Sequence, residues 1–370
     1  MNRILALTER APRVVRLRRG DAEFLLAHHR GRIEVVPTPD RGRYRLTALG
    51  VAGVLPCPHV RLAIRPKLPP GDLLRLLDPL APDDLSTPVE TDSLLDVLAR
   101  RFAVRLRELV ANGLHRGYVE KRAAGPTLIG RLDVAEQVGT FRRDVLHSRY
   151  DELTTDIDIN RHLHAIVQTV LAQSDISDAT RGEFEALRPH FCNIAAARSS
   201  HFVKPPGYGP VLAVASLLDR GLAPGPGSGF EPGPAFLLDL QRAFELAVTM
   251  RLEAAFAERP TFRVCAQPWL NVVASGSPMH VRPDIVIERR GQMVAVVDAK
   301  WKRPIATGAI GDDVYQVLGY TAALGLRRAA LVYPGRRIRR VSYELTGGIA
   351  LDVWSTRPGG SLSRLAATIE

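Results

Sequence analysis

Residues 282–302, RPDIVIERRGQMVAVVDAKWK, contain two short apolar runs on either side of the turn-forming residues RRGQ. Unbroken apolar runs bounded by a turn signal are typical of strands that are buried on both faces of a sheet. If the chain folds back about this turn, Asp284 lies opposite residue 297 or 298, and directly opposed residues have Cβ atoms about 5 Å apart. Lys300 follows Asp298 by two positions and therefore shares its face. The segment predicts a buried hairpin that gathers two carboxylates and one ammonium at one end.

This combination of charges favours metal-assisted hydrolysis of a phosphodiester. Two carboxylates so close repel each other, and each raises the pKa of the other unless a cation neutralises them. A hard ion such as Mg²⁺ prefers oxygen ligands and keeps several water and substrate phosphate oxygens in its shell. The ion polarises a phosphoryl group and lowers the pKa of a bound water, while an ammonium such as that of Lys300 stabilises developing charge. One ion or two would fit the pattern. The alternative is a surface hairpin in which Lys300 only bridges two acidic residues.

Composition narrows the class of protein. A chain of 370 residues can form two or three domains, and a mean hydropathy of −0.02 fits a soluble globular protein. No apolar run approaches the length of a membrane span, and the first residues lack the apolar stretch of a secretory signal. The three cysteines, Cys57, Cys192 and Cys265, form neither a CxxC pair nor a disulfide framework. We therefore expect a cytoplasmic protein that does not associate with membranes.

The positive charge is concentrated in the first part of the chain. The net charge is +11, and residues 1–150 hold 26 basic against 17 acidic residues, a net +9. A basic half could bind phosphates or an acidic protein partner, or it could be a solvated basic surface. Only five of the 50 basic residues are Lys. Because Lys300 is one of them, its position hints at a site where a compact ammonium is required.

Turn residues and apolar periodicity predict a β-rich α+β domain over residues 1–150. Residues 14–68 contain short strand-like runs separated by Gly, Pro and Asp, namely RVVRLRR, EFLLAHH, RIEVVP, YRLTALGVAGVLP and VRLAIRPKL. In residues 71–110 the apolar positions recur every three or four residues, which predicts helices with Asp72 and Asp92 as N-caps. A strand-and-turn segment follows at 117–134.

Residues 151–370 predict a second domain with a mixed α/β order of elements. A capped helix at 154–173 opens a helical connector over 151–220, and nine Gly or Pro residues in 221–235 predict a flexible loop. Over 236–370 we expect a helix, three strands, a helix around 312–324 and the strand AALVYP, which together indicate a mixed sheet flanked by helices. The first of these helices has the apolar stripe Leu237, Leu240, Phe244, Val248, Leu252 and Phe256.

Several of these residues together resemble the PD-(D/E)xK nuclease core. The matching elements are Pro283–Asp284, the run DAK at 298–300, and Gln316 with Tyr320 in a Q-x-x-x-Y pattern. Gln316 and Tyr320 are four residues apart and share one face of a helix. The resemblance implies that this helix lies beside the site, where its Gln and Tyr position the Lys and bind phosphate. Simple helix packing would also explain the pair.

The same resemblance implies a metal site. A helix before the first core strand often supplies a Glu in this family, and Glu245 in RAFELA is the candidate. The alternative is a solvated glutamate beside two arginines. The implied metal ligands are Asp284, Asp298 and Glu245, the implied cofactor is Mg²⁺ with Mn²⁺ as a substitute, and the implied catalytic residues are Asp284, Asp298, Lys300, Gln316 and Tyr320.

Longer segments resemble the McrC family, the endonuclease subunits of McrBC modification-dependent restriction systems. They are VRLAIRPKL (60–68), GLHRGYVEKRAAGPTLIGRLDV (113–134), YDELTTDIDINRHLHAIV (150–167), and DAKWK with DVYQVLGY. The resemblance covers most of the chain, and residues 1–50 and 221–235 are the least similar. It implies an N-terminal domain that docks on a hexameric AAA+ GTPase, McrB, and stimulates GTP hydrolysis. It also implies a C-terminal domain that cleaves double-stranded DNA, while the motor subunit reads the modified cytosine.

Two other functions stay open. The sequence contains no G-x-x-x-x-G-K-[ST] motif, in agreement with an NTPase on a separate subunit. The chain could instead be a self-sufficient nuclease for DNA junctions or RNA, although its large non-nuclease half argues against this. It could also be a cleavage-inactive adaptor that activates an AAA+ motor, although the intact acidic residues and Lys300 argue against that. Asn160 and Arg161 match the family segment, and we interpret them as structural.

Overall fold

The computed structural model describes residues 3–79, 94–139, 144–199, 202–222, 236–273, 275–302 and 311–369. The chain divides into two compact units, one made of Met1–Arg101 with Ser216–Glu370 and the other of Phe102–Ala215. These bounds differ from the predicted division at residue 150, which falls inside strand β9 (Leu146–Thr154). Most of the predicted loop at 221–235 and the predicted cap Asp92 lie outside the described residues.

The first unit begins with two small sheets that enclose a common core. A four-stranded sheet has the order β1-β6-β5-β10, and a three-stranded sheet has the order β2-β4-β3. Leu25 of the helix α1, Leu46 of β4 and Leu62 of β6 are fully buried in this core. The elements are β1 (Arg3–Thr8), β2 (Arg13–Arg16), α1 (Arg19–His28), β3 (Ile33–Pro37), β4 (Arg43–Ala48), β5 (Val51–Pro56), β6 (Val60–Arg65), α2 (Pro70–Leu77) and β10 (Phe236–Asp239).

The structure corrects two expectations in this region. The run EFLLAHH, predicted as a strand, belongs to α1. The buried residues of this helix, Asp21, Ala22 and Leu25, recur with the spacing of a helix face. The predicted helix from residue 236 begins later, because Phe236–Asp239 form β10 and pair with β5. Gly53 of β5 permits this pairing, since a Cβ there would lie 2.1 Å from the carbonyl oxygen of Phe236. Asp239 then caps the helix α8 (Leu240–Phe256) by accepting from the backbone N–H of Arg242.

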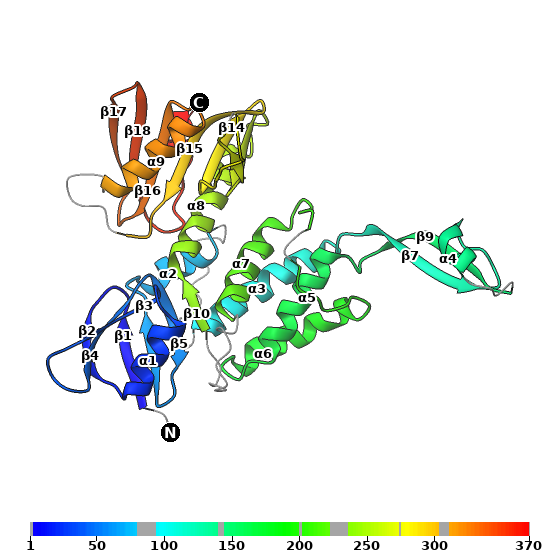
Figure 1. Ribbon diagram of the computed structural model, residues 1–370, viewed down its shortest axis with the longest axis horizontal. Coiled ribbons are helices and arrows are strands. Elements are labelled where there is room, and N and C mark those ends of the chain that lie inside the picture. Colours follow the sequence, from blue (N-terminus) through cyan, green and yellow to red (C-terminus); the bar gives the residue numbers. More distant parts are fainter. Residues whose placement is uncertain are drawn as a thin grey trace. The chain divides into compact units, whose positions relative to one another are not determined.

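The rest of the first unit is a six-stranded mixed sheet with the order β11-β14-β15-β16-β18-β17 (Figure 1). β15 pairs in parallel with β16, and β16 with β18, while the other pairs are antiparallel. The elements are β11 (Phe262–Ala266), β12 (Leu270–Asn271), β13 (His280–Val281), β14 (Ile285–Arg289), β15 (Gln292–Ala299), α9 (Gly311–Ala323), β16 (Arg328–Pro334), β17 (Arg339–Leu345), β18 (Ile349–Thr356) and α10 (Ser363–Ile369). The mixed α/β order expected for this part of the chain is confirmed.

Helices bury both faces of the central strands of this sheet. Val296 of β15 packs with Val317 of α9 and Leu331 of β16 in one hydrophobic cluster. Ala295 and Val297, which point to the other face of the sheet, are also fully buried. On that part of the sheet α8 contacts β11 and β15, and α10 packs on α8. The predicted burial of the apolar run on both faces is therefore confirmed.

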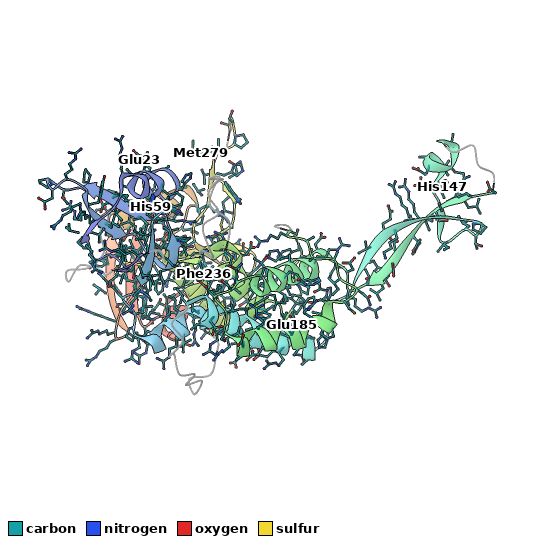
Figure 2. The ribbon with its side chains drawn as sticks, turned by 90° about the horizontal axis from the view of Figure 1, so that it is seen from below. Glu23, His59, His147, Glu185, Phe236 and Met279 are labelled. Carbon is teal, nitrogen blue, oxygen red and sulfur yellow. The ribbon has the colours of Figure 1, made fainter. Side chains whose placement is uncertain are left out.

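The second unit combines a helical cluster with a long antiparallel ribbon. Its helices are the later part of α3 (Leu94–Ala111), α5 (Asp158–Leu171), α6 (Asp178–Leu187) and most of α7 (Gly209–Gly221), with a short 3₁₀ turn at Arg188–Phe191. β7 (Gly117–Gly125) pairs with β9 along its whole length, and β8 (Arg131–Leu132) and α4 (Val134–Gly139) lie beside β9. Figure 2 marks the ribbon by His147 and the helical cluster by Glu185. No helix among the described residues is long and apolar enough to cross a membrane.

Asn160 ties the ribbon to the helices of this unit. Its side chain is fully buried at the start of α5. Its Nδ2 donates to the backbone oxygens of His115 at 3.0 Å and Thr155 at 2.7 Å, and its Oδ1 accepts from the hydroxyl of Tyr208 at 2.8 Å. Because His115 and Thr155 flank the two long strands, this one amide holds the base of the ribbon in place.

Candidate active site

The hairpin β14–β15 brings Asp284 and Asp298 together at one end. Arg290 and Gly291 adopt φ values of 51° and 77°, so the turn occurs where the sequence predicts it. Ile285 pairs with Val297 in the register of the two strands, which places the preceding residue Asp284 opposite Asp298. The backbone N–H of Ala299 donates to Oδ2 of Asp284 at 3.1 Å and fixes its position.

Lys300 completes the group of charges. Its Nζ lies 2.8 Å from Oδ2 of Asp298, which is fully buried at the end of β15. Its backbone N–H donates to the carbonyl oxygen of Val332 in the neighbouring parallel strand at 2.9 Å. By contrast, Oδ1 of Asp298 is buried and accepts no hydrogen bond from any residue that the structure describes. Within the described part of the chain, no N–H group or hydroxyl therefore donates to this oxygen.

Burial and mutual repulsion shift the titration of these groups. Burial raises the pKa of Asp284 to about 6, and the nearby charge of Asp298 adds to the effect. Burial also raises the pKa of Asp298, although the ammonium of Lys300 opposes this. For Lys300 burial acts to lower the pKa, but the combined attraction of the carboxylates leaves it raised, so the ammonium stays charged. The site holds more negative charge than Lys300 alone can balance.

Gln316 and Tyr320 of α9 form a chain of hydrogen bonds that begins at Lys300. Nζ of Lys300 donates to Oε1 of Gln316 at 2.8 Å, and Nε2 of Gln316 donates to the hydroxyl of Tyr320 at 3.1 Å. The hydroxyl of Tyr320 in turn donates to the carbonyl oxygen of Arg282 at 3.5 Å. The four-residue spacing thus places both side chains on the face of α9 that meets the site.

Glu245 lies near this group but already has protein partners. Its Oε1 accepts from Nε2 of Gln241 at 2.9 Å. Its Oε2 accepts from Arg242 at 3.2 Å and from Gln267 at 3.1 Å. Burial raises the pKa of Glu245, and the charge of Asp284 raises it further. The structure therefore brings Glu245 near Asp284, and a metal ion would have to share the oxygens of Glu245 with three donors.

Sequence reasoning missed several residues that hold the site in shape. Gln241 donates to the carbonyl oxygen of Ala299 at 2.7 Å and accepts from the backbone N–H of Trp301 at 2.8 Å. It therefore fixes the backbone on both sides of Lys300. Its position one helical turn before Glu245 was a usable signal. Indole Nε1 of Trp301 donates to Oε1 of the buried Glu9 at 2.8 Å, and no sequence pattern links these distant residues.

The donor set fits a hard divalent cation. Among the described residues no three His, Cys, Asp or Glu side chains are gathered as a complete set of metal ligands. Mg²⁺, however, is commonly bound by only one or two carboxylates, with water and substrate oxygens in its other positions. The unpartnered Oδ1 of the buried Asp298 and the raised pKa of Asp284 are what a bound cation would relieve. Asp284 and Asp298 are thus the residues best placed to bind one, with Glu245 beside them.

Comparisons with known proteins place the chain in a family. Two solved structures, both from Thermococcus gammatolerans, resemble it. One is a chain of a refined half-complex from the tetradecameric assembly of McrB AAA+ hexamers with bound McrC, with 16% identity and a TM-score of 0.48, covering 99% of this chain and 98% of that chain. The other is a chain of the McrBC complex, with 19% identity and a TM-score of 0.42, covering 66% and 85%.

No curated protein matches the chain. The family model of the McrBC 5-methylcytosine restriction system component, however, matches residues 46–334. This match spans well over half of the 370 residues and includes Asp284, Asp298, Lys300, Gln316 and Tyr320. The chain belongs to the McrBC 5-methylcytosine restriction system component family.

Proposed function

We propose that this chain is the Mg²⁺-dependent DNA endonuclease subunit of a McrBC-like, modification-dependent restriction system, with a PD-(D/E)xK core in residues 236–370. The observation that carries the proposal is the set of Asp284, the fully buried Asp298 and Lys300, in which one oxygen of Asp298 accepts no hydrogen bond from any described residue. Family membership supports a role in a restriction system. The resemblance of the site to PD-(D/E)xK nucleases supports the chemistry.

Each residue has a definite part in the proposed reaction. Asp284 and Asp298, with Glu245 beside them, would hold Mg²⁺, which supplies charge neutralisation at the scissile phosphate and a water of lowered pKa. Lys300, kept charged by Asp298, orients the attacking water and stabilises negative charge that develops on the phosphate. Gln316 accepts from the Lys300 ammonium and limits its rotation.

The proposal also includes a motor partner. The sequence has no P-loop motif, so nucleotide hydrolysis belongs to a separate subunit. The resemblance to McrC indicates that this subunit is an AAA+ GTPase hexamer, which the chain stimulates. We expect the chain to cut double-stranded DNA efficiently only when it is assembled with this ring.

A pair of matched lysine substitutions tests the proposed chemistry. Lys300→Gln removes the ammonium that faces Asp298, whereas Lys302→Gln removes an ammonium two residues away that pairs with Asp313 at 2.8 Å. With the cognate ring, GTP, modified duplex DNA and Mg²⁺, Lys300→Gln should lower the cleavage rate by about 10²- to 10³-fold. Lys302→Gln should cleave at a rate near that of the wild type. Both variants should still stimulate GTP hydrolysis.

Other outcomes would replace the proposal. Cleavage at the wild-type rate by Lys300→Gln would remove Lys300 from the mechanism. A wild-type protein that stimulates GTP hydrolysis but never cuts DNA would be an adaptor. Efficient cleavage of DNA without the ring or nucleotide would identify a self-sufficient nuclease.

A further inference from the structure

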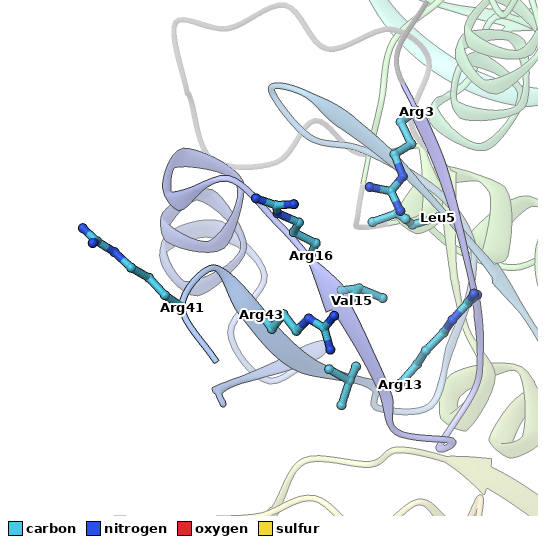
Figure 3. Close-up of a pocket in the computed structure, with 8 residues that line it drawn as sticks. Arg3, Leu5, Arg13, Val15, Arg16, Arg41 and Arg43 are labelled. Atoms are coloured by element: carbon cyan, nitrogen blue, oxygen red, sulfur yellow. The ribbon is translucent and has the colours of Figure 1, made fainter. Parts of the chain in front are cut away.

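Five arginines line one cavity of the N-terminal sheets. The cavity has a volume of about 480 Å³, and its other lining residues are three apolar residues of β1 and β2. The arginines, which we call the arginine cradle, are Arg3 of β1, Arg13 and Arg16 of β2, Arg41 just before β4, and Arg43 at the start of β4. Figure 3 shows them around the cavity, with Arg41 extending away from the other four. Among the residues that the structure describes, no acidic side chain lines it.

The register of the sheet places two of these charges directly against each other. Arg16 of β2 is the cross-strand partner of Arg43 of β4. Like charges that face each other across a sheet destabilise it. The nearest compensation is Asp40, whose carboxylate lies 3.5 Å from Arg43, and both side chains of that pair are mostly exposed. Exposed pairs of this kind contribute little. The fold therefore tolerates a repulsion that a bound anion would relieve.

Unlike Arg43, the other four arginines of the cradle have no acidic partner among the described residues. Within this part of the chain, the one hydrogen bond of the Arg13 side chain is to the backbone oxygen of Ala6. Arg3, Arg16 and Arg41 make no ion pair or hydrogen bond through their side chains with any residue that the structure describes. Arginine in place of lysine does not distinguish these positions, because 45 of the 50 basic residues in this chain are arginine. What distinguishes the five arginines is their placement, which gathers charge from three strands of two sheets around one hollow.

We propose that the arginine cradle binds the phosphates of a duplex DNA backbone. Arginine binds phosphate oxygens bidentately, and a DNA duplex presents one negative charge per about 1.7 Å of its axis, so it can satisfy several arginines at once. A single carboxylate of a peptide could not bridge charges that lie on three strands. This inference rests on the proposed function, because the nuclease activity is what brings duplex DNA to the chain. The cradle would anchor DNA outside the cleavage site without reading its sequence.

A charge-matched pair of double variants tests the cradle. Arg16→Gln with Arg43→Gln removes the opposed pair, and Arg30→Gln with Arg32→Gln removes two exposed arginines of the same region. The control residues Arg30 and Arg32 come just before Ile33, and Ile33 pairs with Ala48 at the end of β4. They are therefore at the opposite end of β4 from Arg43. Binding of the full chain to a labelled duplex is measured by fluorescence anisotropy over a range of salt concentrations, without Mg²⁺ so that no cleavage occurs.

The cradle variant should bind less tightly than the control variant. The slope of log K against log salt should become shallower by about 0.9 for each phosphate that the variant no longer neutralises, or about 1.8 for the two arginines together. Its melting temperature should be unchanged or higher, because a repulsion has been removed. If the double variant does not fold, Arg16→Gln alone should show half the change in slope.

An equal weakening of DNA binding in both double variants would show that total charge matters and not the cradle, and would overturn the proposal. Unchanged DNA binding together with weaker assembly on the cognate ring would assign this surface to an acidic protein partner and would also overturn it. The result is independent of the nuclease test, since weaker DNA binding can be measured in a chain that never cuts DNA.

Discussion

Aspartates in two regions of this protein differ in their hydrogen-bond partners and in the direction of their pKa shifts. In the second unit, Arg161 donates to both carboxylate oxygens of Asp156, at 2.8 and 2.9 Å, and the backbone N–H of Ala195 donates at 2.9 Å. These hydrogen bonds, first of all those from Arg161, lower the pKa of Asp156 to about 2. In the first unit, burial and mutual repulsion raise the pKa of Asp284 to about 6, and Asp298 keeps a buried oxygen without a partner.

The contrast separates a carboxylate that stabilises the fold from carboxylates that the fold tolerates. A buried or paired charge is stabilising only when hydrogen bonds replace the water that it has lost. Asp156 meets this condition within its own unit. Asp284 and Asp298 do not, and a set of acids that costs stability while lying beside a charged lysine is typical of a functional site.

The largest effect concerns the exchange of single aspartates for asparagine. Asp284→Asn should lower cleavage by on the order of 10³-fold or more, because the cation loses a ligand. The same change should leave the melting temperature of the metal-free protein unchanged or higher, since it removes a buried repulsion. Asp156→Asn should have the opposite effects. The unfolding free energy should fall by about 1–2 kcal/mol because the hydrogen bonds are weaker, and the cleavage rate should change little. Cleavage assays and thermal melts without metal check both.

A marked loss of stability in metal-free Asp284→Asn would contradict the comparison, because it would make Asp284 a structural residue like Asp156. Metal titrations followed by thermal melts provide a second readout. Mg²⁺ should raise the melting temperature of the wild type and of Asp156→Asn, but not that of Asp284→Asn.

The second prediction tests the structural side of the comparison at Asn160. Asn160→Leu leaves the hydroxyl of Tyr208 and the backbone oxygens of His115 and Thr155 without their buried partner. We expect a loss of about 3 kcal/mol in unfolding free energy, or on the order of 100-fold in the unfolding equilibrium. The control is Asn112→Leu, which removes one exposed hydrogen bond to the carbonyl oxygen of Glu108. Equal denaturation midpoints for the two variants would show that the Asn160 network is not stabilising.

The third prediction follows from the opposite pKa shifts. Asp284 has a folded pKa of about 6 against an ordinary 3.8, so the metal-free folded state binds a proton more tightly than the unfolded chain. This contribution to stability is present at low pH and is lost as pH rises from about 4 to about 6. Asp156, with a folded pKa of about 2, contributes stability above pH 4 that is lost as pH falls towards 2.

The pH dependence of the cleavage rate should follow the protonation of Asp284. Below pH 6 a proton competes with the cation for this carboxylate, and the rate at limiting Mg²⁺ should fall by about tenfold per pH unit. Melting curves of the metal-free wild type and of Asp284→Asn between pH 4 and 6 check the contribution to stability, because the wild type should lose more stability than the variant across this window. A cleavage rate that is flat between pH 5 and 7 would argue against the raised pKa.

The elements of the candidate site were largely predictable from local sequence. The RRGQ turn and two apolar runs determine the hairpin, and the period of two then places Asp284, Asp298 and Lys300 at one end of it. The spacing of Gln316 and Tyr320 likewise places them on one helix face. These predictions succeed because each depends on residues that are close in the chain or share one regular element.

What could not be predicted depends on distant contacts. Glu9 and Trp301 are separated by 292 positions, and neither lies in a pattern that points to the other. The apolar stripe from Leu237 suggested a helix, but Phe236–Asp239 form β10 by pairing with the distant β5, where Gly53 leaves room for the close approach of Phe236. The same is true of α1, where a short apolar run permits either element until its packing partners are known.

The smallest effect lies at the end of the hydrogen-bond chain in the candidate site. Tyr320→Phe removes the hydroxyl that accepts from Gln316, which in turn accepts from Lys300. Because Gln316 keeps its bond to the ammonium, we expect only a few-fold loss in cleavage rate with no change in Mg²⁺ affinity. Tyr315→Phe is the matched control, since Tyr315 belongs to the same helix and its side chain is 76% exposed. If Tyr320→Phe instead raised the concentration of DNA needed for half-maximal cleavage while the maximal rate stayed the same, the hydroxyl would bind substrate phosphate and not position Lys300. If both tyrosine variants cleaved like the wild type, Tyr320 would have no role in cleavage and the functional hydrogen-bond chain would end at Gln316. The contrast with Asp156, whose carboxylate oxygens are both hydrogen-bonded, would then apply only to the acidic residues and Lys300.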